Sequence, residues 1–301
     1  MQSRNEDVMD IDKLFIKRCF DLARLGAGSV SPNPMVGAVI VHNKRIIGEG
    51  YHQMYGQAHA EVNAVASVSS EDQHLLTKST IYVSLEPCSI FGRTPPCTDL
   101  ILRNEIPRVV ISCVDQTEGV QVDLHVLVEE GQKLSRFRNT FVSKNRPFII
   151  LKWAQSADGY IGKPQEEIAI SNAISKRLVH LWRAVLDAIL IGTNTAVTDN
   201  PQLNNRRYFG TPPLRIAPDF QQRIPTSHYL LSDGLPTLVI GPDRQLSNPN
   251  VHFAPAQQPS DLLPTLLSEL KERRITSLLV EGGTQLINHI PQHNLWDEAR
   301  V

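Results

Sequence analysis

One short part of the sequence holds residue types that bind and activate a metal ion. His59 and Glu61 stand two residues apart in the motif HAE, and further along come Cys88, in the motif EPC, and Cys97. A catalytic zinc ion takes three protein ligands and leaves one position open for water, and a histidine with two cysteine thiolates is such a set. The pattern therefore predicts a zinc site made by His59, Cys88 and Cys97.

Glu61 is the predicted proton carrier of this site. Bound Zn²⁺ lowers the pKa of water toward neutrality, but removal of an amino group by hydrolysis also requires a proton on the leaving amine. In an H-x-E motif the glutamate shuttles that proton and is not a metal ligand. We expect both cysteines at or near helix N-termini, where backbone N–H groups favour the thiolate.

Each of these features is common by chance when it is taken alone. A single H-x-E motif is a weak signal, and cysteines often serve as small buried residues. The order H-x-E, then P-C, then a second cysteine favours a metal site. A structural zinc site usually has four protein ligands, and the remaining candidates, His52 and Cys113, have no recognisable spacing to the other three.

The composition is that of a globular protein with room for two domains. Of its 301 residues, 41% are hydrophobic and 20% are charged, which suits two cores of ordinary size. The 30 Lys and Arg nearly cancel the 31 Asp and Glu, so the net charge does not indicate a nucleic-acid or membrane-surface partner. Because the sequence has neither a signal peptide nor a long apolar run, we expect a cytoplasmic protein. Its four cysteines are then thiols or metal ligands and not disulfides.

Helical and strand periods alternate along the first half of the chain. Apolar residues at three- and four-residue steps predict a helix over residues 11–26, and short β-branched runs predict a hairpin over 35–52. The elements expected next are a helix over 59–68, a strand over 79–87, a helix over 97–105 and a strand over 107–114. Such alternation indicates a layered α/β domain.

A second α/β domain is expected after a polar, basic stretch at 136–147. This stretch is the predicted boundary between domains 1–145 and 146–301. The expected strands of the second domain are 148–153, 187–192, 236–241 and 276–283, and the expected helices are 171–186 and 260–273.

Motifs along the whole chain resemble those of a known enzyme family. The first half contains, in this order, SPNPMVGAVIV, GEGYH, AHAEVNAV, VSLEPCS and GRTPPCTDLI. The second half contains LKWAQSADGYI, DAILIGTNTAVTDNPQLNNR and LLVEGGTQLI. Together they resemble the bifunctional deaminase-reductases of riboflavin biosynthesis. The resemblance implies a cytidine-deaminase-like three-layer α/β/α domain followed by a dihydrofolate-reductase-like α/β domain.

The resemblance also implies two activities and two cofactors. A zinc-dependent deaminase would act on 2,5-diamino-6-ribosylamino-4(3H)-pyrimidinone 5′-phosphate, and an NADPH-dependent reductase would then convert the ribosyl group of the product to ribityl. The implied partner is this phosphorylated pyrimidine, without a nucleic acid or a membrane, and a homo-oligomer is left open.

Site residues follow from the matched motifs. The implied zinc ligands are His59, Cys88 and Cys97, and the implied catalytic residues are Glu61, Lys152 and Asp199. The implied substrate contacts are Asn33, Arg93, Arg183, Leu203, Arg206 and Glu281. The implied cofactor contacts are Ala154, Thr195, Asp199, Gly282 and Gly283. Arginine forks suit a ribose phosphate, and a glycine turn lets backbone N–H groups approach a dinucleotide phosphate.

The sequence departs from the family pattern at four places. Ile90 stands where the family usually has a histidine, and Ala169 stands where it usually has a tryptophan near the cofactor. After Gln121 the usual crossover helix is missing, so we expect an incomplete or rearranged end of the first sheet. The reductase domain is expected to be short, because relatives continue beyond LWDEARV.

Two functions of other classes are not excluded by the sequence. A nucleic-acid or nucleoside deaminase shares the H-x-E and P-C motifs, although the balanced charge and the second α/β domain argue against a nucleic-acid substrate. A catalytically impaired metal- or nucleotide-binding relative is the alternative if the four departures have disabled the sites.

Overall fold

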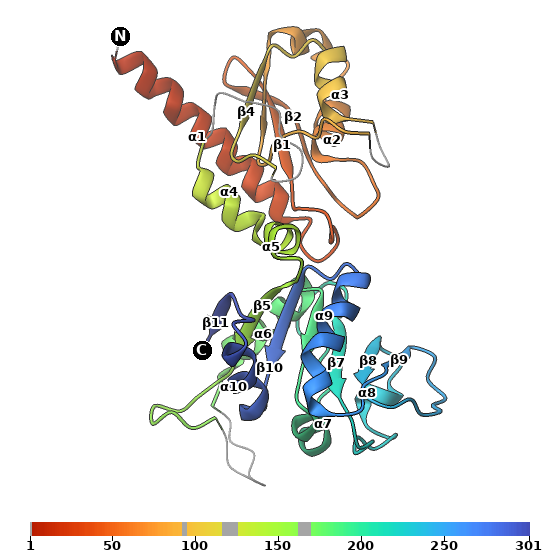
Figure 1. Ribbon diagram of the computed structural model, residues 1–301. Coiled ribbons are helices and arrows are strands. Elements are labelled where there is room, and N and C mark those ends of the chain that lie inside the picture. The colour runs from red at the N-terminus through yellow and green to blue at the C-terminus, as the bar shows by residue number, and fades with distance from the viewer. Residues whose placement is uncertain (1, 92–94, 116–125, 162–169) are drawn as a thin grey trace. The chain divides into compact units, whose positions relative to one another are not determined.

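The computed structural model describes residues 2–91, 95–115, 126–161 and 170–301. The chain divides into two compact units, Met1–Ser143 and Lys144–Val301. Each unit contains its own β-sheet with helices packed on it (Figure 1). Among the described helices, none combines the length and the apolar character that a membrane crossing requires.

A four-stranded sheet with the order β2-β1-β3-β4 forms the centre of the first unit. Strand β1 is antiparallel to β2 and to β3, whereas β3 and β4 are parallel. The elements of this unit are α1 (Gln2–Arg24), β1 (Gly37–His42), β2 (Arg45–Tyr51), α2 (Ala60–Ala66), the 3₁₀-helix η1 (Gln73–Lys78), β3 (Thr80–Val83), α3 (Cys97–Arg103), β4 (Arg108–Ile111), α4 (Val128–Leu134) and α5 (Arg136–Lys144).

The alternation of side chains along β1 explains why helices cover both faces of this sheet. Val39 and Val41 pack with Phe15 and other residues of α1. Ala38 and Ile40 point to the opposite face, where they pack with residues of α2 and α3. Because successive side chains of a strand point to opposite faces, an apolar β1 produces two cores and the predicted three-layer arrangement.

A seven-stranded parallel sheet forms the centre of the second unit, with the order β11-β5-β10-β6-β7-β8-β9. Its elements are β5 (Phe148–Lys152), α6 (Ala173–Val185), β6 (Ala188–Leu190), α7 (Thr193–Asp199), β7 (Leu214–Pro218), α8 (Tyr229–Ser232), β8 (Thr237–Ile240), β9 (Val251–Ala254), the 3₁₀-helix η2 (Pro259–Asp261), α9 (Leu262–Glu272), β10 (Ser277–Glu281), α10 (Thr284–Gln292) and β11 (Glu298–Arg300).

Parallel strands bring their carboxyl ends to one edge of this sheet. Strand β10 lies between β5 and β6, and Glu281 is paired in register with Lys152. In open parallel sheets, ligands bind at this edge where the strand order changes direction. The topology therefore places two of the predicted site residues at the expected position for a ligand.

Most of the predicted elements are present in the structure. No prediction was made for β7, β9, β11, α4, α7 and α8, which are all short. Residues 136–144 of the expected boundary stretch form helix α5. Residues 116–125, which include the site of the expected missing crossover helix, lie outside the described residues. After them, residues Val128–Leu134 form helix α4. In the described part of the first sheet, the strand at the edge is β4.

Candidate functional site

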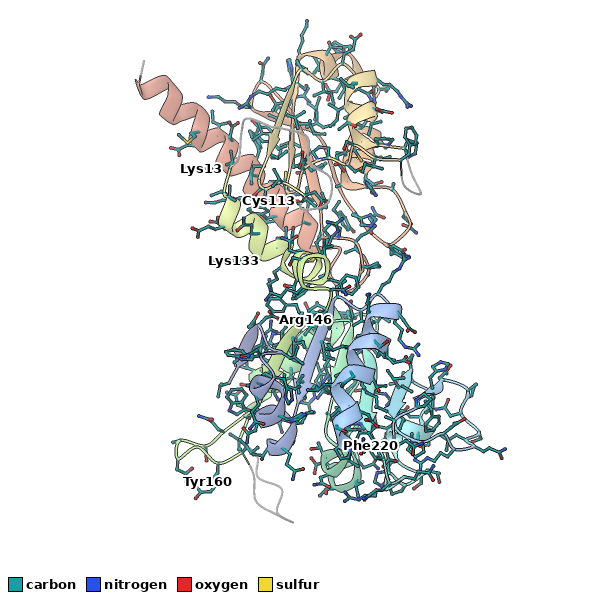
Figure 2. The ribbon with its side chains drawn as sticks, in the orientation of Figure 1. Lys13, Cys113, Lys133, Arg146, Tyr160 and Phe220 are labelled. Carbon is teal, nitrogen blue, oxygen red and sulfur yellow. The ribbon has the colours of Figure 1, made fainter. Side chains whose placement is uncertain are left out.

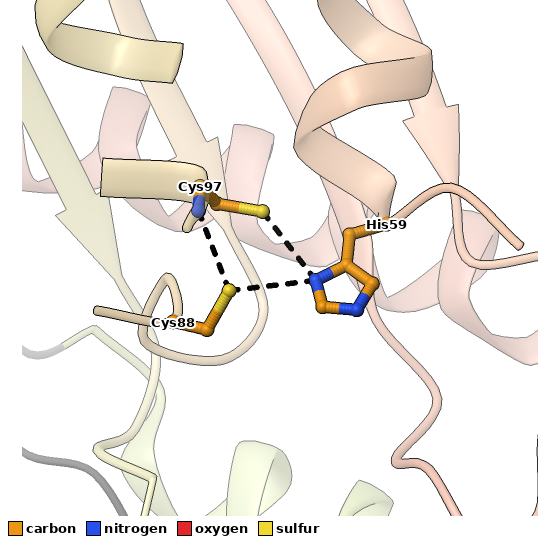
Figure 3. A group of neighbouring side chains, drawn as sticks. All are labelled: His59, Cys88 and Cys97. Carbon is orange, nitrogen blue, oxygen red and sulfur yellow. Dashed lines mark hydrogen bonds between the residues drawn. The ribbon is translucent and has the colours of Figure 1, made fainter. Parts of the chain in front are cut away.

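Three side chains that are far apart in the sequence converge in the first unit (Figure 3). The Nδ1 atom of His59 lies 3.5 Å from the Sγ atom of Cys88 and 3.4 Å from the Sγ atom of Cys97. One ligand atom from each residue lies within 4.8 Å of the other two. No other group of three or more His, Cys, Asp or Glu residues in the described part of the chain is arranged to hold a metal ion.

These separations fit a tetrahedral zinc ion. With Zn–N of about 2.0–2.1 Å and Zn–S of about 2.3 Å, the nitrogen and each sulfur should be about 3.6 Å apart. The observed 3.5 and 3.4 Å lie close to that value. Three soft or borderline ligands also leave one tetrahedral position for water, as a catalytic zinc site requires.

Two short helices and one loop position the three ligands. His59 is the N-cap residue of α2, and Cys97 is the first residue of α3. Cys88 was expected at or near a helix N-terminus, but it lies in the loop that follows β3. Its sulfur reaches a helix start through space, because the Cys97 backbone N–H donates to Cys88 Sγ at 3.3 Å.

The pKa values of the two thiols are shifted in opposite directions. A hydrogen bond from Cys97 lowers the pKa of Cys88 to about 4, which makes Cys88 the thiolate. The pKa of Cys97 is raised, because its proton is held by the neighbouring Cys88 thiolate and because the thiol is largely buried. Zinc binding at this site must therefore displace the proton of Cys97, since both ligands bind as thiolates.

Glu61 lies next to the metal ligands but does not belong to them. It is in the first turn of α2 and only 3% of its surface is exposed. Burial raises its pKa, because a carboxylate loses hydration inside the protein. His59 and the Cys97 thiol both act on this pKa in the opposite direction, because the Glu61 carboxyl group lies beside the metal ligands, at a position from which a proton can be passed.

Asn33 is oriented by His52, for which the sequence suggested no role except that of a possible fourth metal ligand. The Nδ1 atom of His52 lies 3.0 Å from the Ala58 carbonyl oxygen, which can only accept. Nδ1 therefore carries a proton. Burial also lowers the pKa of His52, which favours the neutral ring with no proton on Nε2. Its Nε2 atom must then accept from the Asn33 amide nitrogen, 3.1 Å away, which leaves the Asn33 carbonyl oxygen to face other partners.

The remaining residues named for the first unit are placed as follows. Arg93 lies outside the described residues, as does Ala169 of the second unit. Ile90, which replaces the usual histidine, is 55% exposed. Cys113, labelled in Figure 2, is buried, and its thiol donates to the Ser84 carbonyl oxygen at 3.8 Å; it is not part of the three-ligand group.

A cavity of about 420 Å³ opens in the second unit at the carboxyl edge of the sheet. Most of the predicted reductase residues line it: Lys152, Ala154, Arg183, Thr195, Asp199, Leu203, Glu281, Gly282 and Gly283. They come from β5, α6, α7, the loop after α7 and the end of β10. Arg206 is exposed and lies on the same loop as Leu203, but it is not among the lining residues.

The glycine turn after β10 explains how a dinucleotide could approach the backbone. Gly282 and Gly283 have φ values of +82° and +80°, which L-residues rarely adopt. A Cβ atom on Gly283 would lie 3.4 Å from Thr195 Oγ1. The turn therefore has no side chain between its backbone and Thr195 of α7, and a glycine backbone of this kind, together with the basic lining residue Lys152, fits a phosphate-bearing cofactor.

Known protein families match both units. The family model for the RibD C-terminal domain matches residues 147–301, more than half of the chain. The chain belongs to the RibD family. The model for the cytidine and deoxycytidylate deaminase zinc-binding region matches residues 9–113, which contain all three ligands of the candidate metal site. The predicted family and both predicted fold types are thereby confirmed.

The sequence similarity of this chain to other RibD proteins extends over both units. Riboflavin biosynthesis protein RibD of Aquifex aeolicus is 34% identical over 314 residues, which cover 98% of this chain and 87% of that protein. The Escherichia coli protein of the same name is 30% identical, and the matched region covers 96% of this chain and 86% of that protein.

Two solved structures have the same architecture along nearly the whole chain. A diaminohydroxyphosphoribosylaminopyrimidine deaminase/5-amino-6-(5-phosphoribosylamino)uracil reductase from Thermotoga maritima is 34% identical, with a TM-score of 0.85 over 95% of this chain and 84% of that one. Acinetobacter baumannii RibD, at 31% identity, gives a TM-score of 0.85 over 97% of this chain and 86% of its own.

Proposed function

We propose that this chain is a bifunctional enzyme of riboflavin biosynthesis that acts twice on one phosphorylated pyrimidine. Its first unit deaminates 2,5-diamino-6-ribosylamino-4(3H)-pyrimidinone 5′-phosphate, and its second unit reduces the ribosyl group of the product to ribityl with NADPH. The proposal is supported by family membership over both units and by the similar Thermotoga maritima structure, whose name gives both a deaminase and a reductase. The observation that carries it is the cluster of His59, Cys88 and Cys97 beside a buried glutamate.

Zinc is the cofactor of the first unit, as the matched zinc-binding region and the ligand cluster indicate. When bound by the three ligands, it supplies a Lewis acid that makes water nucleophilic at neutral pH. Glu61 is the residue that would accept a proton on its carboxylate from the attacking water and pass it to the leaving amine. Its raised pKa suits this role, because a general acid-base works best when its pKa is near the operating pH.

Asn33 is proposed to hold the pyrimidine ring. Because His52 accepts from the Asn33 amide nitrogen, the amide oxygen of Asn33 is presented as an acceptor for a ring N–H or an amino group. Arg93 is proposed to contact the substrate as well, on the basis of the motif match alone. Ile90 cannot supply the polar contact of the usual histidine, so the substrate must be held without it.

NADPH is proposed to bind in the cavity of the second unit, where it would supply a hydride. The glycine turn at Gly282 and Gly283, with Ala154, Thr195 and Asp199, would hold it against the sheet edge. Lys152 and Asp199 are proposed to act next to the reacting carbon, and Glu281 and the Leu203 backbone would contact the sugar. Leu203 has a φ of +52°, a strained conformation that is typical of functional sites.

A small-molecule substrate is favoured over a nucleic acid by the balanced charge of the chain, with 30 basic and 31 acidic residues. We also propose a cytoplasmic location, and domains that correspond to residues 1–145 and 146–301.

Mass analysis of the products tests the proposed function. Purified, zinc-loaded chain should convert the diaminopyrimidine to the aminouracil with release of ammonia, and the addition of NADPH should add two hydrogens to the sugar. Binding of zinc and NADPH without either conversion would favour the impaired binding protein instead.

A further inference from the structure

Cys88 differs from the other two zinc ligands in the way its backbone is held. His59 caps α2 and Cys97 begins α3, whereas residues 86–89 have neither helical nor strand structure (Figure 3). A tetrahedral metal site requires its ligand atoms at fixed distances from one another. The loop that carries Cys88 must therefore be held by contacts other than those of a helix or a strand.

Helix α3 holds this loop from one side. The backbone N–H and the Oγ1 atom of Thr98 donate to the Cys88 carbonyl oxygen, at 3.2 and 3.3 Å. Together with the contact from the Cys97 backbone N–H to Cys88 Sγ, they fix Cys88 relative to Cys97. These contacts do not restrain the chain that leads from β3 to Cys88.

Glu86 holds that chain from the other side. Its backbone N–H donates to the Cys113 carbonyl oxygen at 3.0 Å, and its Oε2 atom accepts from the Asp115 backbone N–H at 3.1 Å. Glu86 is only 5% exposed, and burial of a polar group costs free energy unless the group is hydrogen-bonded. Pro87 separates Glu86 from Cys88 and has a fixed φ, so a displacement of Glu86 is passed on to Cys88.

Asp115 is in turn held by helix α5. The Nη1 atom of Arg138 donates to Asp115 Oδ1 at 2.6 Å. Only 20% of the Arg138 side chain and 11% of the Asp115 side chain are exposed. A continuous series of contacts within the first unit therefore leads from α5 through Asp115 and Glu86 to the zinc ligand Cys88.

We propose that Glu86 is a positioning residue of the zinc site, which connects the Cys88 loop to the segment after β4 and so fixes the Cys88 sulfur at its distance from the other two ligand atoms. This inference rests on the proposed deaminase function of the first unit. Glu86 is not part of the three-ligand group, so it would act on the metal only through Cys88. Residues that orient metal ligands in this way typically contribute about 10–100-fold to metal affinity or activity.

The zinc affinity of the metal-free chain tests this role without an activity assay. It is measured by competition with a chromogenic zinc chelator for the wild type, Glu86→Ala and Glu86→Gln. Glu86→Ala should weaken zinc binding by about 10–100-fold. Glu86→Gln keeps an oxygen that can accept from the Asp115 N–H, so its affinity should stay within about threefold of the wild type.

Asp12→Ala is the matched control for a general loss of stability. Asp12 is 3% exposed and accepts from the Tyr82 hydroxyl and from both Nη atoms of Arg108. Arg108 begins β4, at the end of the strand opposite to Asp115. This variant also removes a buried carboxylate from the first unit, so it should unfold at lower urea concentration but bind zinc as tightly as the wild type.

Arg138→Met keeps the test decisive if Glu86→Ala folds poorly. It removes the support of Asp115 and should weaken zinc binding by a smaller factor than Glu86→Ala. The double variant Glu86→Ala/Arg138→Met should bind zinc little more weakly than Glu86→Ala alone, because both changes act through Asp115. Wild-type zinc affinity in a folded Arg138→Met would contradict this series of contacts.

The outcomes distinguish this inference from the function beneath it. If the wild type binds no zinc, the proposed deaminase function fails. If the wild type binds zinc and folded Glu86→Ala binds it equally well, Glu86 does not position the site. The inference is also overturned if Glu86→Gln is as weak as Glu86→Ala, or if Asp12→Ala loses as much zinc affinity as Glu86→Ala.

Discussion

The two sites of this chain are built in different ways. The metal site depends on three side chains whose ligand atoms lie within 4.8 Å of one another, held by two helix starts and one loop. The reductase cavity draws its lining from β5, α6, α7, a loop and the end of β10. The first site is thus specified by residue chemistry, and the second by the packing of a parallel sheet and by backbone geometry. This difference determines how each site should respond to substitution.

Removal of one zinc ligand should give the largest effect, and it should be confined to one activity. Cys97→Ser removes a thiolate that completes the three-ligand set, so zinc and ammonia release should both be lost. NADPH-dependent reduction of the aminouracil should persist, because the second unit has its own core. Metal analysis and the two activity assays check this, with Cys113→Ser, a buried cysteine outside the site, as the matched control. Full deamination by a variant without zinc would contradict the assignment.

Glu61→Gln should give the next largest effect. It removes the proton carrier and leaves all three ligands in place, so deamination should fall by about 10²–10⁴-fold while zinc content stays at the wild-type level. Loss of the metal in this variant would mean that Glu61 supports the ligands and does not carry protons.

The stability of the second unit should depend on pH through Asp297. Burial alone would raise the pKa of Asp297, but hydrogen bonds from Arg146, from the Ile149 backbone N–H and from Lys144 outweigh it and lower the pKa to about 2. Because this value lies below that of an unfolded aspartate, the stabilisation is complete above about pH 4 and is lost as the pH falls through about 2.

Asp297→Asn should therefore lower the free energy of unfolding of the second unit by about 2 kcal/mol at pH 7 and flatten its acid dependence. Urea unfolding at several pH values measures both effects. Glu269→Gln, which breaks a more exposed pair between α9 and its C-cap residue Arg273, should cost at most about 0.5 kcal/mol. Equal losses in the two variants would show that the Asp297 contacts contribute no more than a surface pair.

The glycine turn offers the most subtle test. Gly283→Ala places a Cβ atom on a residue with a φ of +80°, which costs about 1–2 kcal/mol and should shift the turn enough to weaken NADPH binding measurably in a fluorescence titration. Gly234→Ala is the matched control, because Gly234 has a φ of +81° with open space around it and lies outside the cavity. It should lose similar stability and bind NADPH normally; a similar loss of affinity in both would exclude a specific role for the turn.

The same difference between the sites explains what the sequence could predict. His59, Cys88, Cys97 and Glu61 can be identified from the sequence alone, because few other residue types perform their chemistry and their order along the chain is distinctive. The β1–β2 hairpin and the part of α1 from residue 11 onward were predicted from the spacing of their apolar residues, whereas the first nine residues of α1 were not.

Other features required the folded chain. The pairing of Arg183 with Glu281 joins residues 98 positions apart, and no local pattern in the sequence indicates that these two side chains meet. The role of His52 toward Asn33 depends on the Ala58 carbonyl, which fixes the tautomer through a backbone contact. Strands β7 and β9, of five and four residues, are specified by pairing with neighbouring strands more than by their own sequence.

Two separately built sites are proposed to act in succession on one pyrimidine, and one measurement tests this most directly. NADPH oxidation by Cys97→Ser is followed with the diaminopyrimidine and, separately, with the aminouracil that deamination would produce. We expect oxidation only with the aminouracil, whereas the wild type should oxidise NADPH with either substrate. Oxidation of NADPH by Cys97→Ser at the wild-type rate with the diaminopyrimidine would contradict the proposal, because reduction would then not depend on the zinc site.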